Sequence, residues 1–93
     1  MTPVSADPST RRLSDLPRGR SAVVNAVEPR SPADRVAMRL EDLGFVPGEV
    51  LRVISLGPIG RDPMVVQVGF TRFALRRSEA ARVLVTETDA EPA

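Results

Sequence analysis

The chain has 93 residues, enough for one small domain, and 13 basic against 12 acidic residues give a formal charge of +1. All the basic residues are arginine, and the sequence contains no Lys, His, Cys, Tyr or Trp. Without His, Cys or Lys, the chain lacks the usual catalytic bases, nucleophiles and Schiff-base formers, so the composition argues against an enzyme. The same absences exclude metal sites built on His or Cys, and any disulfide framework.

The charges are concentrated in the middle of the chain. Residues 11–88 hold all the arginines and nine of the twelve acids and so carry +4, a mild basic bias that favours an acidic partner surface without selecting one. No run approaches 18 consecutive apolar residues, and no apolar stretch follows the basic pair near the N-terminus, so neither a membrane span nor a signal peptide is expected. These patterns predict a soluble cytoplasmic protein.

Polar ends flank the predicted domain. Residues 1–12 and 88–93 are rich in polar residues and proline, which predicts a disordered N-terminal extension and a disordered tail around a domain at 13–87. At the start of that domain, residues 13–19 are typical of a turn that points two leucines inward. The β-branched and small residues at 21–27 then predict a strand.

A helix is predicted over residues 32–43. Ser31 is the expected N-cap, Pro32 takes the tolerated first position, and Asp34 completes a capping box. Gly44 is the expected left-handed stop. The apolar residues that recur at helical spacing are Ala33, Val36, Ala37, Leu40 and Leu43.

The remaining chain is predicted as strands and turns. Apolar alternation and Gly-Pro punctuation indicate strands at 49–56, 64–68, 71–76 and 83–87, a turn at 45–48, a loop at 57–63, a Gly69-Phe70 hairpin turn and a helical turn at 78–82. Together with the first strand, these elements predict a mainly β fold: a small five-stranded barrel with one inserted helix and a short helical turn before the last strand. Closing the barrel would remove exposed strand edges.

Several short motifs in register resemble the FeoA family. The segment Arg39-Leu-Glu-Asp-Leu-Gly-Phe-Val-Pro-Gly48 at the end of the predicted helix is similar to the family's helix end and turn. Other family motifs are matched in the same order along the chain, by the segments at 13–19, 60–63, 73–76 and 78–80. The resemblance therefore covers about residues 13–87. Arg61 is an additional residue within the family's Gly-Asp-Pro element.

The resemblance implies an SH3-like barrel and a cytoplasmic accessory role beside FeoB, a membrane ferrous-iron transporter with a cytoplasmic GTPase domain. It implies neither catalysis nor a cofactor, although the family is linked to a transition metal ion. Two alternatives stay open: a basic SH3-like module that binds nucleic acid, and a stand-alone relative of the domain found at the C-terminus of iron-dependent metalloregulators. The missing Tyr and Trp and the interleaved acids argue against nucleic-acid binding.

Four arginines are candidate contacts to a protein partner. Arg35 and Arg39 lie four residues apart on the outer face of the predicted helix, and Arg72 and Arg76 share one face of a predicted strand. Each pair either forms a solvated face or binds carboxylates of a partner, because the planar guanidinium suits bidentate pairing. Self-association is left open, since the core of so small a domain adds limited stability.

Five apolar residues are further candidates for partner contact. Phe45 and Val46, in the turn after the helix, either plug the end of the barrel or anchor a partner. Leu56, Pro58 and Ile59 form an apolar lip beside the predicted loop, which is either the wall of a peptide groove or a simple turn.

No metal site is predicted. Glu41 and Asp42 are adjacent on the helix, so their side chains diverge, and Asp62 stands alone before a proline. The three methionines are weak soft donors, so the sequence favours scattered, solvated carboxylates.

Overall fold

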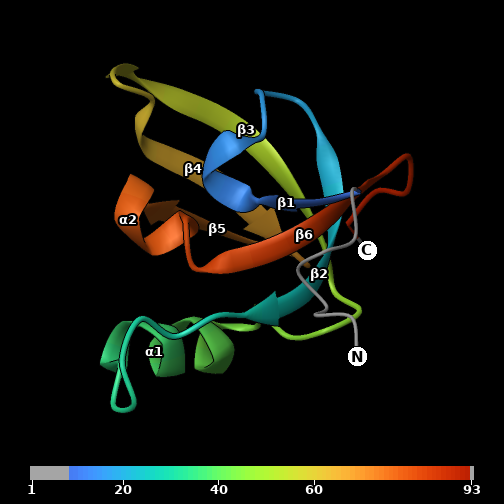
Figure 1. The fold of residues 1–93 in the computed structure, drawn as a ribbon. Coiled ribbons are helices and arrows are strands. Elements are labelled where there is room, and N and C mark those ends of the chain that lie inside the picture. Colours follow the sequence, from blue (N-terminus) through green and yellow to red (C-terminus); the bar gives the residue numbers. More distant parts are fainter. Residues whose placement is uncertain (1–8, 93) are drawn as a thin grey trace.

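A six-stranded antiparallel sheet forms the body of the molecule in the computed structural model, which describes residues 9–92 (Figure 1). The strand order is β1-β6-β2-β3-β4-β5, with β1 and β5 at the two ends. The elements in chain order are β1 (Thr10–Arg12), the 3-10 turn η2 (Leu13–Asp15), β2 (Ser21–Val27), α1 (Arg35–Leu43), β3 (Val50–Ile59), β4 (Asp62–Val68), β5 (Thr71–Leu75), α2 (Arg77–Ala80) and β6 (Val83–Thr88). The predicted mainly β fold with one inserted helix and a helical turn before the last strand is confirmed.

One strand was not predicted. Thr10–Arg12 lies in the segment expected to be disordered, yet it pairs with β6, with Thr10 opposite Thr86 and Arg12 opposite Leu84. The side chains of this strand stay outside the core and are therefore polar, so its sequence looks like that of a linker. Residues 1–8 of that predicted extension lie outside the described residues. At the other end β6 reaches Thr88, the first residue of the predicted tail.

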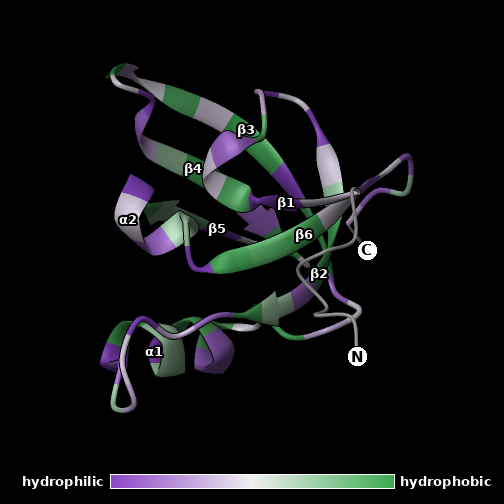
Figure 2. Ribbon diagram, in the orientation of Figure 1, coloured by the Kyte–Doolittle hydropathy of each residue, from purple (hydrophilic) through white to green (hydrophobic). Residues whose placement is uncertain are grey.

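The core lies inside the curved sheet. Figure 2 shows hydrophobic residues along β6 and alternating with polar ones on β3 and β4. The sheet does not close on itself, since β1 and β5 do not pair with each other among the described residues. η2 and α2 contact each other near these two end strands. The largest fully buried side chains are Phe45, Leu13, Leu16, Leu51 and Met64.

The helix α1 begins later than predicted. Asp34 is its N-cap, and the carboxylate accepts the Val36 and Ala37 N–H groups at 3.0 and 3.3 Å. Ser31, the predicted cap, is exposed and lies in the turn before the helix. Asp34 is the N-cap in place of Ser31 because its carboxylate makes two further bonds. It accepts the Arg30 N–H at 2.9 Å and pairs with the Arg82 guanidinium at 2.7 Å. The helix ends at Gly44, as predicted, with a φ of 116°.

The predicted loop at 57–63 is the end of a β-hairpin. β3 continues to Ile59 and β4 begins at Asp62, which leaves Gly60 and Arg61 as the turn. Both turn residues have positive φ, 62° and 65°, as a type I′ turn requires. The expectation of a loop was wrong because the glycines and prolines are accommodated within the paired strands.

An irregularity in the β3–β4 hairpin explains how glycine and proline residues fit within the paired strands. The register shifts between the Leu56–Met64 and Ile59–Asp62 pairs, so Pro58 and Pro63 lie at unpaired positions, where a missing N–H breaks no ladder bond. Gly57 allows the two strands to approach closely there, because a Cβ at this position would collide with the backbone carbonyl of Asp62.

Candidate functional site

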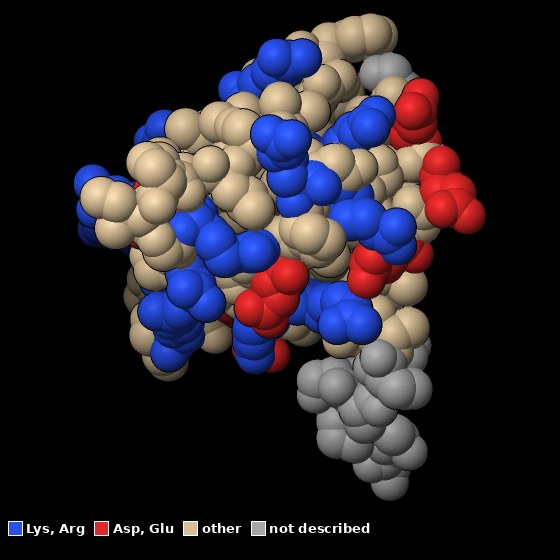
Figure 3. Space-filling view, turned by 90° about the horizontal axis from the view of Figure 1, so that it is seen from above, with Lys and Arg blue, Asp and Glu red and all other residues tan. Residues whose placement is uncertain are grey.

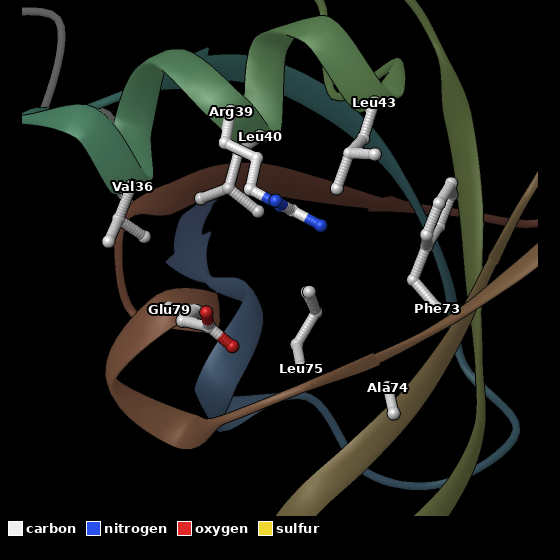
Figure 4. A pocket seen from close by; sticks show the side chains of 8 residues that line it. All are labelled: Val36, Arg39, Leu40, Leu43, Phe73, Ala74, Leu75 and Glu79. Atoms are coloured by element: carbon white, nitrogen blue, oxygen red, sulfur yellow. The ribbon is translucent and has the colours of Figure 1, made fainter.

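A groove lies between α1 on one side and β5 with α2 on the other, with a volume of about 440 Å³. Figure 4 shows helix side chains facing β5 across the open space. The size falls within the range of about 300 to 1,000 Å³ typical of ligand-binding pockets. The groove is lined by Val36, Arg39, Leu40, Leu43, Phe73, Ala74, Leu75 and Glu79.

The helix wall of the groove follows from the spacing of its apolar residues. Val36, Leu40 and Leu43 are four and three residues apart, so they share one face of α1. Leu40 is buried in the core, whereas Val36 and Leu43 are half-buried and face the groove. The helix therefore leaves part of its apolar face uncovered by the rest of the domain.

The opposite wall is anchored by two phenylalanines. Phe73 of β5 is half-buried and packs against Phe45, with ring centroids 5.7 Å apart in a tilted arrangement. Phe45 is fully buried. This contact fixes the Phe73 ring where it borders the groove, and it makes Phe45 a core residue with no exposed surface to offer a partner.

The groove carries one charge of each sign. Glu79 enters from α2, and its carboxylate accepts the Arg76 N–H at 2.7 Å. Arg39 extends from α1 across the opening in Figure 4. Among residues 9–92, no hydrogen bond or ion pair occupies its guanidinium, so Arg39 remains available to a carboxylate from outside the domain.

The predicted contact residues divide into two regions. Arg39 lines the groove, and Arg35 is exposed on the same helix. Arg72 is exposed on β5, and Arg76 is exposed just after that strand, at the N-cap of α2. In contrast, Ile59 lies at the tip of the β3–β4 hairpin, at the opposite end of the molecule from α1 (Figure 1), and is 82% exposed. The expected groove wall at that hairpin is therefore separate from the observed groove.

The other apolar candidates differ in exposure. Leu56 is half-buried and packs on the core, whereas Pro58 is exposed near the hairpin tip. Val46 is 38% exposed in the turn after α1. The most exposed large apolar side chain, Phe70 at 93%, was not among the predicted contacts, although its place in a two-residue hairpin turn was visible in the sequence.

Most of the groove was also missed, since Arg39 is the one lining residue that was predicted as a contact. Leu43 and Phe73 border it but were not predicted as contacts, because their apolar spacing indicates core burial equally well. Glu79 was likewise passed over. The pairing of α1 with β5 across an open gap is a tertiary feature that neither segment encodes by itself.

Many arginines outside the groove are neutralised within the fold. Glu87 binds both Arg11 and Arg20, and the Arg12 guanidinium pairs with Glu28 at 2.9 Å. Figure 3 shows basic side chains spread over one face, with acidic side chains beside several of them. This interleaving does not form the continuous basic stripe typical of a nucleic-acid interface.

Asp34 and Arg82 form a buried ion pair that shifts the pKa of the Asp34 carboxyl. The hydrogen bond from Arg82 holds the pKa of Asp34 well below its usual range, with the Arg30 and Ala37 N–H groups acting in the same direction. Both side chains are largely inaccessible to solvent. The pair joins the start of α1 to the turn just before β6, so its role is structural.

No helix in residues 9–92 is both long and apolar enough to cross a bilayer. Within the same range, no three His, Cys, Asp or Glu side chains come together as a potential metal site.

A family model and several solved structures identify the family. A sequence model of the FeoA domain matches residues 11–87. The crystal structure of Stenotrophomonas maltophilia FeoA in complex with zinc is 55% identical, with a TM-score of 0.76, covering 81% of this chain and 88% of that one. That protein is described as a procaryotic SH3 domain protein and a suggested bacterial ferrous iron transport activating factor.

Two solution structures show the same likeness at lower identity. Chlorobium tepidum FeoA is 35% identical with a TM-score of 0.71, covering 89% of this chain and 75% of that one. Iron(II) transport protein A from Clostridium thermocellum is 31% identical with a TM-score of 0.74, covering 84% of this chain and 46% of that one. No curated protein matches the chain.

Proposed function

Since this chain belongs to the FeoA family of SH3-like proteins associated with ferrous iron transport, we propose that it binds a FeoB-type membrane transporter and modulates it through protein–protein contacts. The observation that carries the proposal is the family match over residues 11–87, nearly the whole folded part of the chain. In this proposal the chain acts in the cytoplasm, next to the GTPase domain of the transporter, and performs no chemistry itself.

The groove between α1 and β5 supports a binding role. It leaves apolar side chains of Val36, Leu43 and Phe73 only half-covered. It also holds Arg39, whose guanidinium has no ion-pair partner within residues 9–92. Apolar surface beside an unpaired guanidinium is typical of an interface that recognises another protein. A partner that binds one conformation of the transporter more tightly than another shifts the transporter toward that conformation, which is how binding alone can modulate transport.

The proposal is tested with the purified chain and the detergent-solubilised transporter. We expect a complex on size-exclusion chromatography and a change in GTP hydrolysis when the chain is in excess. The double variant Arg35→Glu/Arg39→Glu should weaken the complex about tenfold, because two favourable surface pairs become repulsive. Arg18→Glu is the matched control, since Arg18 is exposed in the turn between η2 and β2, away from the groove.

Two results would contradict this function. The first is the absence of any complex together with unchanged GTP hydrolysis and iron uptake in cells that overproduce the chain. The second is a complex that the groove variant and the Arg18 control weaken equally, which would assign binding to another surface.

A further inference from the structure

The strand β5 has a free edge that faces the groove. Among the strands of residues 9–92, β5 pairs only with β4, and the two are joined by the Gly69-Phe70 turn between Val68 and Thr71. In a two-residue hairpin the residues that flank the turn form a hydrogen-bonded pair, and pairs then alternate along the ladder. The backbone N–H and C=O groups of Arg72 and Ala74 therefore point away from β4. No other described backbone group bonds to them.

This free edge lies where another strand would fit. Ala74 itself lines the groove, with Phe73 and Leu75 beside it and the apolar side chains of α1 opposite (Figure 4). An added strand would sit about 4.8 Å from β5, and its backbone would satisfy the outward-facing groups of β5. The half-covered apolar side chains on α1 would then contact alternate side chains of that strand.

The two faces of β5 set the chemistry of the strand that would bind there. Phe73 and Leu75 point inward, whereas Arg72 and Ala74 lie on the exposed face. Arg76, the N-cap of α2, follows the strand directly in an extended conformation and continues this alternation. Side chains on an added strand lie beside those of β5 on the same face. Apolar side chains would therefore enter the groove, and carboxylates would lie beside Arg72 and Arg76. Among the described residues, neither guanidinium has a partner of its own.

Charge argues against a second copy of the chain as the occupant. Two β5 strands paired antiparallel about Ala74 would place Arg72 of one copy opposite Arg76 of the other. Like charges directly opposite each other are destabilising in a sheet. Arg39 also lines the groove and has no partner in the part of the chain that the structure describes, which adds to this preference for an acidic strand.

We propose that β5 takes up, by strand addition, an extended acidic segment of the partner protein in which apolar residues alternate with Asp or Glu. The inference rests on the proposed function as an interaction module and specifies the kind of segment that the module recognises. Apolar side chains supply contact within the groove, backbone bonds to Arg72 and Ala74 fix the register, and the arginines select for acidic residues.

The test uses the full chain and a blocked eight-residue peptide in which valine alternates with glutamate. Amide hydrogen exchange by NMR should show slower exchange at Arg72 and Ala74 when the peptide is added, at least about tenfold, because both N–H groups become hydrogen-bonded. A peptide of the same sequence with alternate amides N-methylated is the control. It keeps the side chains but cannot complete the ladder, so it should give no protection.

Variants of the chain test the two parts of the recognition separately. Arg72→Glu/Arg76→Glu should weaken peptide binding about tenfold and favour a peptide with lysine in place of glutamate. Ala74→Pro removes one outward N–H without removing a bond to β4, so it should also weaken binding, whereas Ala74→Ser keeps the N–H and should bind normally.

Three outcomes would overturn the inference: peptide binding without protection of Arg72 and Ala74, equal binding of the N-methylated peptide, or protection of both amides by the chain alone at rising concentration. The last would make a second copy the occupant. A transporter complex that survives Ala74→Pro would defeat this inference and leave the proposed function standing. Peptide binding with protection of both amides, but without any transporter complex, would support this inference and contradict the proposed function.

Discussion

Arg61 holds a backbone conformation that residues with a side chain avoid. Its φ of 65° lies in the left-handed region, which costs an L-residue about 1–2 kcal/mol. The guanidinium offsets that cost, because it donates to the backbone carbonyls of Ser14 and Leu16. The residue that interrupts the family's Gly-Asp-Pro motif thus joins the β3–β4 hairpin to η2.

Two substitutions at Arg61 separate the strain from the bonds. Arg61→Ala loses the guanidinium and keeps the strained φ, whereas Arg61→Gly loses the guanidinium and relieves the strain. We therefore expect the free energy of unfolding to fall in the order wild type, glycine variant, alanine variant, with about 1 kcal/mol between the two variants. Urea unfolding measures all three. An alanine variant as stable as the glycine variant would show that the turn is not strained.

At the scale of single elements, Asp34 connects helix α1 to the rest of the domain. Its carboxylate caps the helix and pairs with Arg82, which holds its pKa below the usual value of about 3.9. A carboxyl whose pKa is lowered by folding stabilises the native state above its unfolded pKa. That contribution is lost as the pH falls below about 4, toward the folded pKa.

Asp34→Asn should therefore flatten the acid limb of the stability curve. Asparagine keeps an oxygen that can cap the helix but carries no charge for Arg82, so the variant should be less stable at pH 7 and lose less stability between about pH 4 and pH 2. Urea unfolding at a series of pH values provides the measurement. Asp42→Asn, at an exposed position of the same helix, controls for the loss of one carboxylate. Equal flattening by both variants would contradict this role of Asp34.

Local patterns predicted most of the elements but not how distant segments help to define them. The strand at 21–27, the Gly69-Phe70 turn and the stop at Gly44 follow from propensity and turn chemistry, and the structure has all three. The start of α1 moved to Asp34 because Arg82, far along the chain, pairs with that carboxylate. β1 was missed for a similar reason, since its pairing with β6 cannot be read from three polar residues.

The candidate site was predicted less completely than the fold. Arg39 was singled out from its place on the outer face of the helix, and it lines the groove. Leu43 and Phe73 carry no polar signal that distinguishes a groove wall from a core position. Whether such residues are covered depends on the distance between α1 and β5, which is set by packing across the whole domain.

At the scale of the whole molecule, the few aromatic side chains have opposite roles. The sequence has three phenylalanines. Phe45 is fully buried and Phe73 packs against it, so this pair joins the turn after α1 to β5 at the base of the groove. Phe70 is 93% exposed at the tip of the β4–β5 hairpin. The core therefore depends on one aromatic contact, while the third ring adds little to it.

Alanine substitutions should separate these roles clearly. Phe45→Ala should cost about 3–5 kcal/mol of unfolding free energy, because it leaves a cavity in a core with few large side chains. Since small domains have about 5–15 kcal/mol in total, this variant should unfold at a much lower temperature. Phe70→Ala should change the unfolding free energy by less than about 0.5 kcal/mol, because its ring contacts mainly solvent. Thermal and urea unfolding check both variants, and a Phe45 variant that keeps wild-type stability would contradict its place in the core.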